Sequence, residues 1–195
     1  MEQTILEYHE SAGGAYWTGT VLGKEMKFVR VIAGLAIPQL DRQDAAVVII
    51  GELHRSSEPP DFTGLGAGVG SLAEVKRELV QFCHSVKPSH IVVGDEPSRK
   101  LVFPLTDALI GLKPLPLCYA APAHSVGETG RQLVQELLDE ERLHIAHLLS
   151  ILDRSRDQSD HALRFAVNYA LEFSSFYTGK KRKPLAPKLF GTAGL

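Results

Sequence analysis

The sequence predicts an α/β fold built on a mixed sheet, with antiparallel strands first, βαβ units afterwards and helices on both faces. Residues 3–9 and 15–22 alternate polar and apolar side chains around a Ser-Ala-Gly-Gly turn, which is typical of a β-hairpin. From residue 71 onward, helical patterns alternate with short apolar runs, which is typical of βαβ units. The two halves together predict antiparallel strands followed by parallel ones.

Two further strands are expected before the first helix, at residues 26–37 and 45–53. The second is an almost continuous apolar run, which indicates a central strand buried on both faces. Residues 55–70 are rich in Gly, Pro and Ser, so we expect a long loop that includes the sequence GLGAGVG at 64–70.

Helices and short strands alternate in the second half. Ser71 and Glu74 form a capping-box pattern that predicts the start of a helix, which Lys87-Pro88 ends. The later elements that we expect are a strand at 91–94, a helix at 97–111 with a break at Pro104, a strand at 115–120, helical residues 128–152 with interruptions near 142–144, and an amphipathic helix at 158–176. This organisation predicts one domain, residues 1–176, followed by a basic, extended tail, residues 177–195.

Composition narrows the class of protein. The chain has 195 residues, of which 44% are hydrophobic and 23% charged, as in an ordinary soluble globular domain. A net charge of −2 gives no overall attraction to nucleic acid or acidic lipid, although a local basic patch is compatible with it. Cys83 and Cys118 have no CxxC spacing, so we expect reduced core cysteines and a cytoplasmic protein. We expect neither a signal peptide nor a membrane-spanning segment.

Two adjacent carboxylates follow the expected strand at 91–94, in the sequence IVVGDEPS. Functional residues of α/β sheets gather at the carboxyl ends of parallel strands, and Asp95 and Glu96 stand at such an end. A carboxylate there can bind a divalent cation if another element supplies a second carboxylate. The alternative is that Asp95 or Glu96 only caps the helix that begins at Pro97.

The second pair of carboxylates lies at the start of the last long helix. Asp157 and Asp160 are three residues apart and therefore lie on one side of its first turn. Acidic residues at a helix N-terminus are also stabilised by the helix dipole, so capping is again the alternative to metal binding.

The order of elements and these two acidic positions resemble the RNase H-like nucleases. That family has three antiparallel strands, then helix, strand, helix, strand and helix. Its acids lie on the first strand, at the end of the fourth strand and on the last helix, where two metal ions activate water for attack on a phosphodiester. Within the superfamily, the C-terminal nuclease domain of phage large terminases is the most similar, because its last helix carries an Asp-x-x-Asp-Ala-Leu-Arg-Tyr-Ala-like phrase. The comparable text here is DQSDHALRFA at 157–166, and the resemblance covers roughly residues 45–175.

The resemblance implies a metal-dependent endonuclease that acts on DNA. It implies Mg²⁺ or Mn²⁺ held by Asp95 and Asp160, with Glu96, Asp157 and an N-terminal acid, Glu7 or Glu10, in support. It also implies DNA and other phage packaging proteins as partners, and it leaves the oligomeric state open. The chain has no GxxxxGK[ST] phrase, so the terminase motor half is not expected.

The family's first-strand Asp has no clear counterpart, since no Asp occurs before Asp41. If the first strand is 3–9, the matching position falls near His9, which Glu7 and Glu10 flank. This is the alignment that we expect.

In the other alignment the first strand is 28–37. The family's Gly-x-Asp-x-Ala phrase then matches residues 34–38, and Ala36 takes the place of the acid. This alignment would leave one strand too few before the helix at 71. Both alignments predict an incomplete metal site, so the alternative function is a catalytically degenerate domain that binds nucleic acid or a protein partner.

A separate candidate site lies at Glu52 and His54, which point to one side at the end of the strand at 45–53. A strand ending in Gly-Glu-x-His resembles the haem-binding lipoprotein and erythromycin-esterase group, which implies a small-molecule or haem-type site. The alternative is an ordinary Glu and His at the mouth of a loop.

Four consecutive basic residues mark the tail: Lys180, Lys181, Arg182 and Lys183. Such a cluster can contact the phosphate backbone of a nucleic acid, and its alternative is a solvated basic tail.

Overall fold

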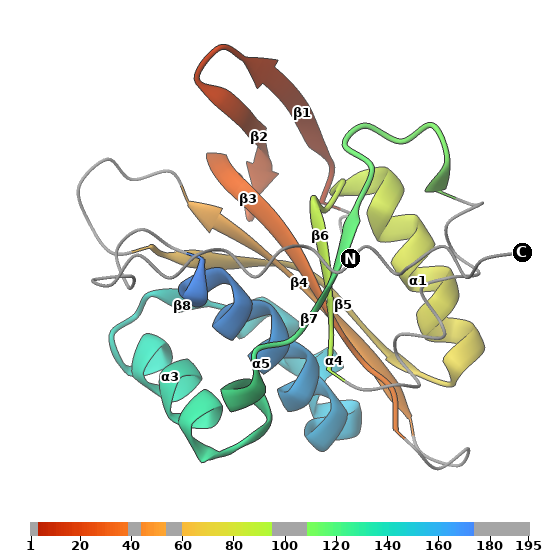
Figure 1. Cartoon of the computed structure of the whole chain (residues 1–195), viewed down its shortest axis with the longest axis vertical. Helices are drawn as coiled ribbons and strands as arrows, with labels where there is room; N and C mark the ends of the chain where they lie inside the picture. The colour runs from red at the N-terminus through yellow and green to blue at the C-terminus, as the bar shows by residue number, and fades with distance from the viewer. Residues whose placement is uncertain (1–3, 39–43, 54–59, 95–108, 174–195) are drawn as a thin grey trace, which may run out of the picture.

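The computed structural model describes residues 4–38, 44–53, 60–94 and 109–173 of the chain. Five strands form the centre of a mixed sheet (Figure 1). Strands β3 (Lys24–Ala36), β4 (Ala45–Leu53) and β5 (Phe62–Gly70) are consecutive and antiparallel. Strand β6 (His90–Val93) pairs in parallel with β3, and β7 (Leu117–Ala120) pairs in parallel with β6. The order β5-β4-β3-β6-β7 confirms the predicted mixed α/β sheet of RNase H type.

The N-terminal hairpin is an addition to this sheet and not its beginning. Strands β1 (Leu6–Ser11) and β2 (Gly14–Val21) pair with each other, and β2 pairs with β3 between Lys24 and Phe28. The later half of β3 is free to pair with β6 because β3 has 13 residues. The strand that occupies the family's first position is therefore β3, and the expectation that residues 3–9 occupy it was wrong.

Strand β5 was not predicted from the sequence. Residues 55–70 were expected to form a loop, but residues 62–70 pair with β4 along their whole length. Glycine makes the strand possible at this place because helix α1 (Leu72–Ser85) packs directly on it. A Cβ atom at Gly66 would lie 2.6 Å from the ring of Phe82, and one at Gly68 would lie 3.0 Å from Cβ of Glu78.

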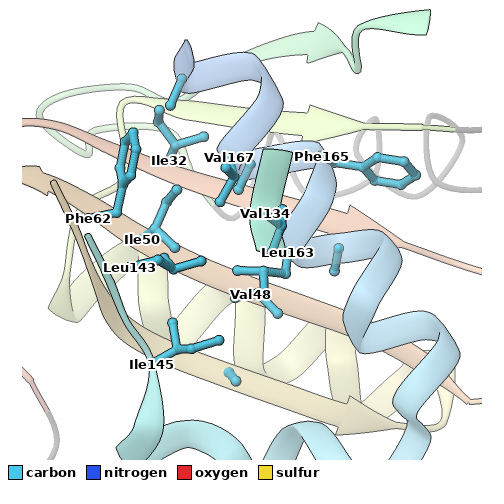
Figure 2. Close-up of a cluster of buried hydrophobic side chains, with 14 of the residues drawn as sticks. Ile32, Val48, Ile50, Phe62, Val134, Leu143, Ile145, Leu163, Phe165 and Val167 are labelled. Atoms are coloured by element: carbon cyan, nitrogen blue, oxygen red, sulfur yellow. The ribbon is translucent and has the colours of Figure 1, made fainter. Parts of the chain in front are cut away.

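Helices cover both faces of the sheet, as predicted. Helix α1 lies on one face and begins with the predicted capping box, in which Ser71 and Glu74 bond reciprocally. Its buried side chains, Val75, Leu79 and Cys83, contact the residues of β3 and β4 that point to that face. Helix α5 (Arg156–Glu172) lies on the other face, where the second apolar cluster is centred (Figure 2).

The predicted helix at 128–152 is broken into several elements. They are α3 (Glu128–Asp139), the short strand β8 (Leu143–His144), the 3₁₀ turn η2 (Ala146–Leu148) and α4 (Leu149–Leu152); η1 (Ala123–Val126) precedes α3 and η3 (Asp153–Ser155) precedes α5. The helix ends before Arg142 because Leu143 pairs with Phe62 at the edge of the sheet.

Most of the predicted helix at 97–111, and the tail from residue 177, lie outside the described residues. Among the helices of the described segments, none is long and apolar enough to cross a membrane.

Candidate metal centre at the carboxyl ends of β3 and β6

The second alignment of the sequence analysis puts the family's first-strand acid at Ala36, the last residue of β3. Alternation along β3 points Ile32, Gly34 and Ala36 toward α5, whereas Val31, Ala33 and Leu35 face α1. Ala36 is only 2% exposed and belongs to the apolar cluster beneath α5. The end of β3 therefore contributes a buried methyl group to this place, where the resemblance would require a carboxylate.

The backbone of α5 rests on β3 at Gly34. A Cβ atom at Gly34 would lie 1.9 Å from the carbonyl oxygen of Ala162, so no residue with a side chain fits there. This contact places the first half of α5 at the carboxyl end of β3.

The carboxyl end of β6 lies beneath a phenylalanine of the same helix. A Cβ atom at Gly94 would lie 2.0 Å from Cζ of Phe165, which is 4% exposed. Phe165 projects from α5 in Figure 2. Asp95 and Glu96 follow Gly94 in the chain and lie outside the described residues, so the structure locates the end of the strand that carries them but not their carboxylates.

Asp160 forms an ion pair within its own helix. Its Oδ2 lies 3.1 Å from Nε of Arg164 and 4.0 Å from Nε of Arg131. The guanidinium of Arg164 is 2% exposed and donates from Nη1 to the carbonyl oxygens of Val126 and Gly127, at 3.0 and 3.3 Å. The carboxylate of Asp160 thus compensates a buried positive charge that joins α5 to the turn before α3.

Neither Asp157 nor Asp160 is the N-cap of α5. The N-cap is Ser155, which makes no side-chain capping hydrogen bond. Asp157 lies in the first turn of the helix and is exposed, so its carboxylate is available to solvent and to the helix dipole.

Glu7, the proposed first-strand acid, lies on β1 in the added hairpin. Its side chain is 79% exposed and lies 3.9 Å from Nε2 of His9. Because β1 pairs only with β2 within the described segments, Glu7 does not lie on the strand that faces α5. The structure therefore brings α5 to the ends of β3 and β6 but does not bring Glu7 there.

A two-metal centre needs several oxygen ligands directed at one point. Within the described ranges, no three His, Cys, Asp or Glu side chains are placed to hold a metal ion. At the end of β3 and β6 these ranges supply Ala36, Gly34, Gly94 and Phe165, which carry no ligand oxygen on their side chains. The described residues alone therefore do not form the metal centre that the resemblance implies, and two of its expected acids, Asp95 and Glu96, lie outside them.

Glu52, the other candidate, is paired with an arginine that sequence reasoning missed. Arg30 on β3 lies opposite Glu52 on β4, and its guanidinium donates to the Glu52 carboxylate and to the carbonyl oxygen of Ala170, the latter at 2.7 Å. Burial raises the pKa of Glu52 more than the charge of Arg30 lowers it. His54 lies outside the described residues. The signal that could have revealed the pair is a lone arginine in the apolar strand sequence MKFVRVIAG.

A group of aromatic rings surrounds His90, the first residue of β6, near Arg30. The rings of His90, Tyr119 and Tyr169 are 5.2–5.6 Å apart between centroids, and Phe173 lies 4.7 Å from Tyr169. Burial lowers the pKa of His90 to about 4, with a smaller contribution from the charge of Arg30. His90 is therefore neutral near pH 7. It lies at the amino end of β6, whereas the candidate metal centre lies at the carboxyl end of that strand.

Comparisons with known proteins give distant likenesses in shape. No family model matches the sequence, and no curated protein matches it. The fowlpox virus resolvase in complex with substrate Holliday junction DNA is 9% identical, with a TM-score of 0.48 over 71% of this chain and 95% of that one. The fowlpox virus Holliday junction resolvase gives 9% and 0.48 over 74% and 99%, and Thermus thermophilus RuvC gives 11% and 0.41 over 72% and 92%. The assignment of an RNase H-like architecture therefore rests on the strand order and connections of this chain itself.

Proposed function

We propose that this chain is an RNase H-like domain that binds nucleic acid and lacks a working cleavage centre. The observation that carries the proposal is Ala36, a buried methyl group at the first-strand position where the family has its acid. Without that carboxylate, the two metal ions of the family's mechanism lose a shared ligand.

The packing of α5 supports the same proposal. Gly34 and Gly94 contact the backbone and the phenyl ring of α5 so closely that a side chain at either position would clash. Asp160 meanwhile compensates the buried charge of Arg164, which gives it a structural reason to be acidic.

Nucleic acid is the proposed partner because the chain contains one dense basic cluster, Lys180 to Lys183. An overall charge of −2 means that attraction to phosphates has to be local. Neutralising phosphates with such a cluster releases counterions, so affinity should fall steeply with salt.

The test is DNA binding measured by fluorescence anisotropy across a range of salt concentrations. We expect the wild type to bind and the quadruple variant K180A/K181A/R182A/K183A to lose up to about three units of the log–log salt slope. The matched control is K76A/R77A on the exposed side of α1, which should leave the slope unchanged. Wild-type binding that is absent, or that does not depend on salt, would overturn the proposal.

A metal-dependent DNA nuclease is the second candidate, and one contact favours it. Because Phe165 touches Gly94, the residues directly after β6 begin next to α5, the helix that carries Asp157 and Asp160. In this candidate Asp95, Asp160, Glu96 and Asp157 would be the ligands and catalytic acids for Mg²⁺ or Mn²⁺. The terminase type and phage packaging partners belong to this candidate alone. It requires Mn²⁺-dependent DNA cleavage that D95N abolishes and that the control D153N on η3 retains.

The third candidate is a small-molecule site at Glu52 and His54. A ligand there would meet a Glu52 carboxylate that is already paired with Arg30.

We also infer a cytoplasmic location, which the free thiols of Cys83 and Cys118 support.

A further inference from the structure

Strand β7 forms one edge of the sheet and is exposed to solvent. It pairs with β6, and within the described ranges no strand lies on its other side. Leu117 at its start is 51% exposed, and Ala120 at its end is also exposed. Two more apolar side chains just before the strand, Ile110 and Leu115, are 72% and 51% exposed. The edge and its surroundings therefore present apolar surface to solvent.

The main-chain groups of two residues in β7 point away from the sheet. The amide nitrogens of Leu117 and Ala121 donate to carbonyl oxygens at either end of β6, at 2.9 and 2.8 Å. Successive residues of a strand direct these groups to alternate sides, so the N–H and C=O groups of Cys118 and Ala120 face away from β6. The edge thus offers the donors and acceptors of both residues to another strand.

Charge does not protect this edge. Natural proteins commonly place charged side chains on an exposed edge strand, which prevents it from pairing with another chain. Residues 109–122 include a single charged side chain, Lys113, which lies outside the strand. Strand β1, whose outer side is likewise unpaired among the described strands, carries Glu7 and Glu10. Of these two edges, β7 is therefore the one suited to pair with another strand.

The exposed edge is symmetric about Tyr119. Pro116 and Pro122 stand three residues before and after it, and proline has no N–H to donate to a further strand. In an antiparallel pair of two copies centred on Tyr119, Cys118 of each copy lies opposite Ala120 of the other. Every outward donor of these residues then meets an outward acceptor. Because the facing side chains are uncharged, this pairing brings no like charges together.

We propose that β7 pairs antiparallel with β7 of a second copy of this chain, about a two-fold axis at Tyr119. A second copy fits better than a charged partner segment, because the edge has no charge that would select one. The pairing uses the same surface on both copies, so it closes into a dimer and does not extend into a fibre. Since it joins only short strands, the dimer should be weak and its population should depend on concentration. The proposal does not rest on nucleic-acid binding or cleavage.

The test is analytical ultracentrifugation of the full-length protein over a range of concentrations. We expect the mass to rise with concentration from 21.3 kDa toward twice that value. Ala120→Pro removes an N–H that faces away from β6, so it should leave the sheet intact and weaken dimerisation at least about tenfold. Circular dichroism and thermal unfolding check that each variant is folded.

A second variant acts through charge. Ala120→Lys should also weaken dimerisation, because the two lysines would lie about 7–8 Å apart across the axis. Added salt should recover part of that loss but none of the loss in Ala120→Pro. The matched control Ala12→Lys, in the exposed turn between β1 and β2, should dimerise as the wild type does.

A disulfide tests the register of the pairing. In C118S/L117C/A121C, the new cysteines of opposite copies would lie about 4.5 Å apart between Cα atoms, within the range that a disulfide spans. Mild oxidation should therefore give a covalent dimer on a non-reducing gel. The matched control C118S/L117C, whose new cysteine faces Ala121 of the other copy, should not be cross-linked.

A mass of 21.3 kDa at every concentration would overturn the proposal and leave the edge to another segment of this chain or to a different protein. So would a dimer that Ala120→Pro and Ala120→Lys both leave as tight as the wild type, since it would use a different surface. Failure of C118S/L117C/A121C to cross-link more than C118S/L117C would overturn the register centred on Tyr119.

Discussion

Phe165 of α5 packs on Gly94, the last described residue before Asp95, and a Cβ atom at Gly94 would lie 2.0 Å from Cζ of the ring. The end of the strand that should present a metal ligand is thus held against an apolar ring. This contact links the packing of α5 to the proposed loss of the cleavage centre, and it can be tested by substitution.

Gly94→Ala should destabilise the domain, because the added methyl group meets a ring that is 4% exposed and cannot move into solvent. We expect a loss of about 1–3 kcal/mol in the free energy of unfolding, measured by urea denaturation. In G94A/F165L the smaller side chain should recover part of that loss, as a double-mutant cycle would show. The control Gly13→Ala has its nearest heavy-atom contact at 3.8 Å and should cost less than about 0.5 kcal/mol. Equal costs at Gly94 and Gly13 would contradict the described contact.

Asp160→Asn should also destabilise, because it leaves the buried guanidinium of Arg164 without its carboxylate. A loss of about 1–3 kcal/mol is expected in the same denaturation experiment. Asp157→Asn removes an exposed first-turn acid and should change stability by less than about 0.5 kcal/mol. If Asp160 were instead one of several clustered metal ligands, its neutralisation would relieve repulsion in metal-free protein, and Asp160→Asn would stabilise.

His90 should make the domain less stable as pH falls from about 6.5 to about 4. Its pKa is about 4 in the folded protein and 6.5 in the unfolded chain, so the unfolded chain binds the proton first in that interval. The stabilisation is complete above pH 6.5 and is lost progressively toward pH 4, with a total of about 3 kcal/mol.

The groups that face the imidazole are Arg30, Ser89, Tyr119 and Tyr169. Subtracting the pH profile of His90→Phe from that of the wild type removes the contribution of other titrating groups, including Glu52. Parallel profiles for the two proteins would show that His90 does not titrate in this interval.

Local patterns predicted much of the fold. The polar–apolar alternation of the hairpin, the Ser71–Glu74 capping box and the apolar side of α5 all reappear in the structure. These features depend on neighbouring residues, so a sequence reveals them directly.

Strand β5 could not be predicted in the same way. Its glycines indicate a loop by propensity, and they form a strand because Phe82 and Glu78 of α1 occupy the space that side chains would need. Missing this strand made residues 3–9 appear to be the family's first strand. The identification of β3, and with it the buried Ala36, depended on knowing that β5 exists.

Two contacts of the candidate site could not be predicted from the sequence either. Asp95 and Asp160 could be chosen by position in the strand and helix order, but the ion pair of Asp160 with Arg164 depends on the burial of Arg164 against Val126 and Gly127. The contact of Phe165 with Gly94 joins two segments that are far apart in the chain.

Cleavage of DNA in the presence of Mn²⁺, with wild type and Asp95→Asn compared side by side, tests the loss of the cleavage centre most directly. Because Ala36 provides no first-strand ligand, we predict that the wild type cleaves no faster than Asp95→Asn. Mn²⁺-dependent cleavage by the wild type that Asp95→Asn lacks would contradict the account and establish a working metal centre.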